Sequence, residues 1–140
     1  MVEAELFVSN QSDISQRWAI VEETGEATYL YLTEPGSMKP TSDAFLFSKV
    51  ILESGAEVQS IAESGMPPPI LRKYATSQAQ RKSTNEAQIS FKWSASGEAV
   101  AVLLEDEPFA AIAGGVSYSK AVAAEGPWGV PWSESALNEF

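Results

Sequence analysis

Two acidic clusters are the side chains of this sequence whose type and spacing come closest to those of a reactive site. They comprise Glu22, Glu23 and Glu26, and Glu105, Asp106 and Glu107. Paired carboxylates act as general acid and base where burial drives their pKa values apart, and they can ligate magnesium or calcium. Both clusters fall in segments typical of turns, where water surrounds a carboxylate. We therefore interpret them as solvated turns, or as an acidic surface that docks a protein partner, ahead of catalytic or metal sites.

Two residue types common in catalytic and metal sites are missing, because the chain has no cysteine and no histidine. Their absence excludes a thiolate nucleophile, a disulfide framework and a Ser-His-Asp triad. It also removes the commonest zinc ligand. The sequence therefore predicts a protein that is not an enzyme, with no cofactor and no metal.

Aromatic residues offer two further candidate surfaces. Trp128 and Trp132 lie among glycine and proline residues near the end of the sequence. They serve either as anchors at a partner interface or as a lid over the protein's own core. Tyr29, Tyr31 and Tyr74 define an alternative site, a pocket for a small molecule between a sheet and a helix.

The charge of the chain restricts its partners. With 9 basic and 19 acidic residues the formal net charge is −10. Such a chain is repelled by nucleic acids and by anionic membranes, so a protein partner, and a basic one, fits better. The N-terminus is acidic, and no apolar run approaches the roughly 18–20 residues of a spanning helix. We expect a cytoplasmic bacterial protein, and a homodimer through exposed strand edges stays open.

Alternating apolar and polar residues predict strands in both halves of the chain. Tyr29 and Tyr31 share one face of such a strand, and Leu30 and Leu32 the other. Turn residues such as Gly25 separate the segments. The predicted strands cover residues 3–8, 18–22, 27–33, 44–52, 88–93, 99–104, 109–112 and 116–122.

One helix is predicted around residues 70–82, because Leu71, Tyr74, Ala75 and Gln78 recur at three- and four-residue spacing. Residues 53–69 are rich in glycine and proline and predict a loop with at most one helical turn. The expected fold is a single α+β domain over residues 1–140, mainly antiparallel β-meanders, with that helix packed on one face.

Two segments of the chain also echo each other. Trp18 precedes Gly25-Glu26-Ala27 as Trp93 precedes Gly97-Glu98-Ala99. Either a hairpin unit is duplicated, or these are the residues that any antiparallel hairpin collects.

The same segments resemble a family of small uncharacterised bacterial proteins, a domain of unknown function with two tryptophan-led β-hairpin units. The resemblance covers mainly residues 17–51 and 89–113, and Phe109 departs from the polar residue that it leads us to expect after Pro108. It implies a bacterial source and a protein outside the membrane, but no activity.

Acidic turns and tail tryptophans together favour a non-enzymatic protein-interaction or binding domain. An acidic immunity or inhibitor protein that neutralises a basic toxin is one example that fits the size and charge. The alternative is a small-molecule-binding domain with a pocket between sheet and helix.

Overall fold

Residues 6–140 are described by the computed structural model of this chain, and their first four strands form one antiparallel sheet. The strands lie side by side in the order in which they occur along the chain. They are β1 (Phe7–Gln11), β2 (Trp18–Thr24), β3 (Ala27–Thr33) and β4 (Pro40–Ser48). The predicted strand over 3–8 is therefore displaced toward the C-terminus, and residues 3–5 lie outside the described part of the chain.

The last five strands form a second sheet, again in chain order. Four of them run antiparallel, and a short fifth strand pairs in parallel with β8. They are β5 (Ile89–Trp93), β6 (Val100–Leu104), β7 (Glu107–Ala113), β8 (Val116–Ser119) and β9 (Val130–Pro131). The prediction of an α+β fold made mainly of antiparallel meanders is confirmed.

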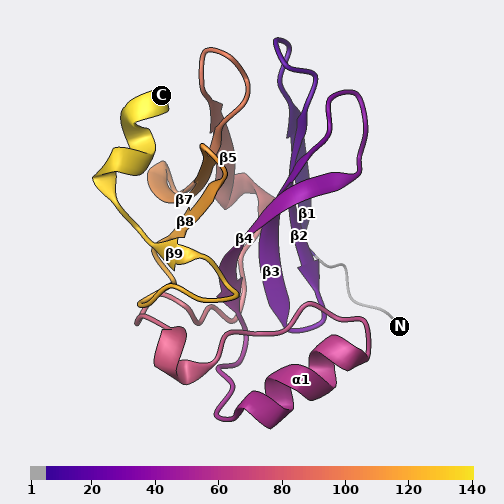
Figure 1. Cartoon of the computed structure of the whole chain (residues 1–140), viewed down its shortest axis with the longest axis vertical. Coiled ribbons are helices and arrows are strands. Elements are labelled where there is room, and N and C mark those ends of the chain that lie inside the picture. The colour runs from indigo at the N-terminus through magenta and orange to yellow at the C-terminus, as the bar shows by residue number, and fades with distance from the viewer. Residues whose placement is uncertain (1–5) are drawn as a thin grey trace.

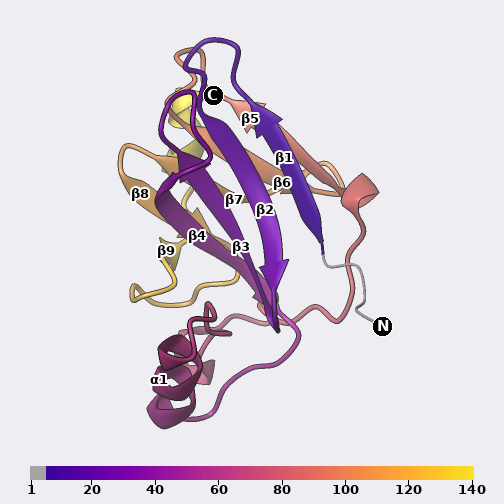
Figure 2. The same cartoon turned by 90° about the vertical axis from the view of Figure 1, so that its right-hand side faces the viewer.

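The two sheets pack against each other, with β4 lying against β7 and β8 (Figures 1 and 2). One cluster of buried side chains draws on both sheets, including Val21 and Leu30 from the first and Val102 and Ile112 from the second. Burying such side chains contributes about 25 cal/mol per Å² of apolar surface removed from water, and this burial holds the sheets together.

Strand β3 places Tyr29 and Tyr31 on one face, as the alternation predicts, and in the structure this face looks away from the second sheet. A register shift in the β3–β4 pairing sets Tyr29 opposite Phe45 but Thr28 opposite Phe47. The two phenylalanines therefore face opposite sides. Phe45 contacts Tyr29 edge-on at 5.5 Å between ring centroids, while Phe47 contacts Phe109 of the second sheet at 6.4 Å. The simple alternation expected for residues 44–52 misses this bulge.

The helix predicted around residues 70–82 is wrong. That segment contains only a 3-10 turn, η1 (Arg72–Tyr74). The segment follows an irregular path because isolated backbone bridges join it to Ser48, Leu52 and Val122, and Ile70 and Ala79 are fully buried in the core. Tertiary pairing thus overrides the helical spacing of its apolar residues.

The single α-helix, α1 (Gly55–Glu63), lies instead in the segment predicted to be a loop. Ser54 and Glu57 form a capping box, in which each side chain accepts a hydrogen bond from the other residue's backbone N–H. None of its side chains is fully buried, and two further 3-10 turns complete the structure, η2 (Glu86–Gln88) and η3 (Glu134–Glu139). Within residues 6–140 no helix is long and apolar enough to cross a membrane.

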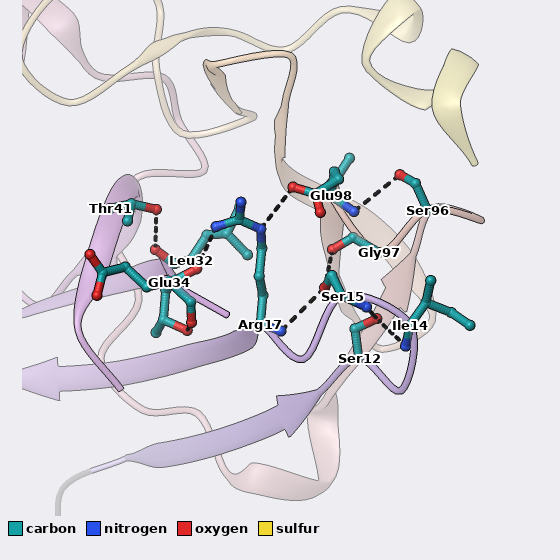
Figure 3. Close-up of polar contacts among 12 residues, drawn as sticks. Ser12, Ile14, Ser15, Arg17, Leu32, Glu34, Thr41, Ser96, Gly97 and Glu98 are labelled. Carbon is teal, nitrogen blue, oxygen red and sulfur yellow. Dashed lines mark hydrogen bonds and ion pairs between the residues drawn. The ribbon is translucent and has the colours of Figure 1, made fainter. Parts of the chain in front are cut away.

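Two hairpin loops join the sheets at the end of the molecule opposite α1 (Figure 1). They have the same length, spanning residues 12–17 between β1 and β2 and residues 94–99 between β5 and β6. The Ser15 hydroxyl donates to the Gly97 carbonyl at 2.7 Å, and Arg17 Nε donates to Glu98 Oε1 at 2.8 Å (Figure 3). Arg17 also donates to the Thr33 carbonyl, so the polar groups of this junction satisfy one another.

The two sheets repeat the same hairpin plan, but this structural repeat does not align the two similar segments found in the sequence. The β1–β2 loop corresponds to the β5–β6 loop, and the two-residue β2–β3 turn corresponds to the β6–β7 turn. Gly25 lies in the second hairpin of its sheet and Gly97 in the first hairpin of the other. The paired tryptophan–glycine motifs therefore do not occupy equivalent positions.

Candidate ligand-binding cavity

A cavity of about 290 Å³ opens on the outer face of the first sheet, beside α1. Strands β3 and β4 supply its floor, α1 and the segment after it supply one wall, and the C-terminal tail supplies another. The residues that line it are Tyr29, Tyr31, Asp43, Val58, Pro67, Pro68, Pro127 and Trp128. Its volume lies near the lower end of the roughly 300–1,000 Å³ typical of small-molecule sites.

The two tyrosines of the floor come from alternate positions of one strand. Their rings stack at 6.1 Å between centroids with an interplanar angle of 21°. Tyr29 is only 6% exposed, whereas Tyr31 is half-buried and more accessible. The pleat of β3 fixes both rings on the same face, so the floor is present before any ligand arrives.

Hydrogen bonds to one carbonyl fix the walls of the cavity. The Tyr29 hydroxyl donates to the Pro68 carbonyl at 2.7 Å, and Trp128 Nε1 donates to the same oxygen at 3.3 Å. The tail is also held through its backbone, because the Phe45 N–H donates to the Trp128 carbonyl at 3.2 Å. Three segments far apart in the sequence thus meet at Pro68, and proline's restricted backbone keeps that wall stiff.

Negative charge dominates the electrostatics of the cavity. Asp43 is exposed at the rim of the cavity, and partial burial of its carboxyl raises its pKa. Burial, followed by the charge of Asp43, also raises the pKa of Tyr29 and of Tyr31, and the charge of Glu22 adds to the effect on Tyr31. None of the lining residues is basic, so no positive charge in the cavity wall balances Asp43.

The residues expected to form a pocket are brought together in part. Tyr29 and Tyr31 line the cavity, but Tyr74 does not. Tyr74 packs behind the wall, with its ring centroid 5.3 Å from that of Trp128. The site lies beside α1, rather than beside a helix at residues 70–82, because that helix does not form.

The tail tryptophans have different environments. Trp128 is 3% exposed and belongs to the core cluster, which is the lid that we considered as an alternative to an interface anchor. Trp132 is half-buried, packs against a small cluster around Ala101 and Ala111, and has the Lys120 ammonium 5.4 Å from its ring centroid. Of the two, Trp132 leaves the larger part of its ring accessible to a protein partner.

The first acidic cluster is divided between three roles. Glu22 lies opposite Tyr29 on the outer face of the sheet and is half-buried. Glu23 accepts a hydrogen bond from the Leu6 N–H at 3.3 Å and pairs with Lys49 at 3.5 Å, so it fastens the β1 edge and the chain after β4. Glu26 is exposed in the turn.

The second acidic cluster stays at a turn, as predicted. Glu105 and Asp106 adopt positive φ angles of 50° and 70°, and both are exposed together with Glu107. Gln88 donates a hydrogen bond to Glu105. Within residues 6–140 no hydrogen bond or ion pair links the two acidic clusters, and no group of acidic side chains is arranged to hold a metal ion.

Five lining residues escaped the sequence analysis: Asp43, Val58, Pro67, Pro68 and Pro127. In the sequence the prolines indicate irregular structure, and nothing about them indicates a cavity wall. Asp43 falls one residue before the predicted strand, although its two-residue spacing from Phe45 could have placed it on the same face.

Comparison with protein-family models, with curated proteins and with solved structures gave no match for this chain. The function of this chain is therefore inferred from the cavity and its chemistry.

Proposed function

We propose that this protein binds a small organic molecule, without transforming it, in the cavity lined by Tyr29, Tyr31 and Trp128. The single observation that carries the proposal is the construction of the cavity. Two stacked tyrosines and a buried tryptophan from the other end of the chain are fixed around one carbonyl, beside a lone carboxylate. Apolar walls with few oriented polar groups are the usual composition of a ligand site.

A docking function for the acidic turns has less support. Glu23 is engaged in fastening the sheet, and Trp128 belongs to the core. The accessible members, Glu26 with Glu105, Asp106 and Glu107, are those of ordinary solvated turns. Docking of a basic protein remains a prediction that requires its own test.

Thermal unfolding in the presence of a metabolite library tests the proposal, with V58F as the blocking variant. A ligand that binds only the folded state stabilises it by about 2.7 kcal/mol at a concentration of roughly 100 Kd, enough to raise Tm by several degrees. Val58 lines the cavity and packs against the edge of the core cluster without being fully buried, so a larger side chain at this position can fill the cavity.

The matched control is I61F, which places the same side chain on the same helix away from the cavity lining. We expect at least one compound to raise Tm of the wild type and of I61F, but not of V58F. The proposal is overturned if no compound stabilises the protein or if V58F responds as the wild type does.

A further inference from the structure

The walls of the cavity have the chemistry of a site for positive charge. Tyr29, Tyr31 and Trp128 contribute aromatic rings, whose faces carry negative electrostatic potential. The remaining walls are proline and valine, and the one charged residue of the lining is Asp43. A cation beside these groups is attracted in two ways, by the quadrupole of the aromatic rings and by the charge of the carboxylate.

Elsewhere in the described part of the chain, three aromatic rings have a cation from the protein itself. Lys73 lies 5.3 Å from the ring centroid of Tyr74, Arg81 lies 5.6 Å from that of Phe47, and Lys120 lies 5.4 Å from that of Trp132. Among residues 6–140 no such pair involves the three rings of the cavity. A cation at these three rings would therefore come from outside the described part of the chain.

The Asp43 carboxylate of the cavity also has no cationic partner among the described residues. Arg17, Lys49 and Arg72 form ion pairs with glutamates elsewhere, and within residues 6–140 none forms with Asp43. Although Asp43 is exposed at the rim, partial burial disfavours the ionised form of its carboxyl, and the nearby charge of Glu22 adds to the negative potential around Tyr31. A bound cation would offset both, whereas an anion would add to the repulsion.

We propose that the ligand is a small organic cation with a compact alkylammonium head group, held against Tyr29, Tyr31 and Trp128 and paired with Asp43. This inference rests on the proposed function, because it names the class of molecule that the same cavity takes. A weakly hydrated alkylammonium suits apolar walls better than a metal ion does, since a metal ion needs several oxygen ligands and the lining offers one carboxylate. The net charge of −10 would draw such a ligand toward the protein.

Two probes of nearly equal shape test the charge of the ligand. Choline carries a trimethylammonium group, and 3,3-dimethylbutan-1-ol replaces its nitrogen by carbon and is neutral. Titration of each probe, followed by calorimetry and by ligand-detected NMR, compares their affinities for the full chain. We expect choline to bind about ten-fold more tightly than the neutral isostere, in line with a desolvated cation–π contact.

Two variants locate the effect. D43N retains the shape of the side chain and should lower choline affinity about three-fold while leaving the isostere unchanged, because water screens an ion pair at an exposed carboxylate and the rings keep the rest of the preference. V58F should abolish binding of both. I61F should bind as the wild type does.

Each remaining outcome overturns the inference that the ligand is a cation. The outcomes also show whether the proposal of a ligand-binding cavity fails with it. If both probes bind equally, or if the isostere binds more tightly, and V58F abolishes this binding, the cavity is a ligand site that does not select cations. Failure of choline to bind, together with a neutral or anionic library compound that V58F excludes, would do the same. If neither the probes nor the library bind at the cavity, the proposed function fails as well.

Discussion

Asp43 illustrates how a single residue of the cavity links stability and binding. Its carboxyl lies at the rim of an apolar cavity, where burial raises its pKa. A raised pKa in the folded state means that folding favours the protonated form. The protein therefore loses stability as the pH rises from the usual range of aspartate, near 3.9, through the raised pKa of Asp43.

D43N is accordingly expected to raise Tm at pH 7 and to weaken choline binding in the same sample. The gain in Tm should shrink as the pH falls toward 4, because the wild-type side chain then becomes neutral too. Thermal unfolding of both proteins between pH 4 and pH 8 measures the difference. A lower Tm for D43N at pH 7 would show that the carboxylate is stabilised in the fold and would remove this part of the account.

Tyr29 is expected to contribute through its hydroxyl as well as its ring. Y29F removes the 2.7 Å donor to the Pro68 carbonyl and leaves the longer bond from Trp128. We expect a loss of about 0.5–1.5 kcal/mol in the free energy of unfolding by urea. Y118F, on β8 and away from the cavity, is the matched control. An equal loss in both variants would contradict a special role for the Pro68 contact.

At the scale of elements, strands could be predicted from this sequence but the site could not. The limits of β3 agree with the prediction, because alternation such as that of Tyr29 and Leu30 is a local property. The helix was misplaced because Ile70 and Ala79 have helical spacing but are buried by long-range bridges. The cavity depends on contacts between Tyr29, Pro68 and Trp128, which lie far apart in the sequence. No local sequence pattern indicates that such distant residues meet.

The junction of the two hairpin loops is an element that should be sensitive to one added carbon. Gly97 has a φ of +72°, and a Cβ there would collide with the hydroxyls of Ser12 and Ser15. Gly115 has a similar φ of +78° with nothing within 4 Å of the added atom. We expect G115A to lose about 1–2 kcal/mol from backbone strain alone, and G97A to lose about 1–3 kcal/mol more from the collision.

Urea unfolding of the two glycine variants measures this difference directly. Equal losses would show that the loops separate freely and that the contacts in Figure 3 do not hold the sheets together.

On the scale of the whole molecule, two meanders of similar plan enclose one core cluster and leave one face of the first sheet for the cavity. The acidic surface can act in two ways. It can steer a cation into the cavity, or it can dock a basic protein by means of the exposed turns.

Replacing Glu105, Asp106 and Glu107 by Gln, Asn and Gln separates these two actions. The formal charge changes from −10 to −7, since three negative charges are removed from the ten. We expect choline affinity to change little, because the turn does not line the cavity. If the turn docks a basic partner, capture of that protein from lysate at low salt should fall in the triple variant and remain in V58F. Equal capture by both would exclude this turn as the docking site.

The claim that the cavity is a ligand site is tested most directly by the indole N–H signals of the four tryptophans in a ¹H–¹⁵N NMR titration with choline and with 3,3-dimethylbutan-1-ol. Trp128 lines the cavity, whereas Trp93 donates to Asn10 and Trp132 donates to Glu134. Trp18 lies at the start of β2. Our prediction for a ligand in the cavity is that the Trp128 signal moves in proportion to occupancy and the other three stay in place. A Trp128 signal that neither probe moves, or equal movement of all four signals, would contradict it.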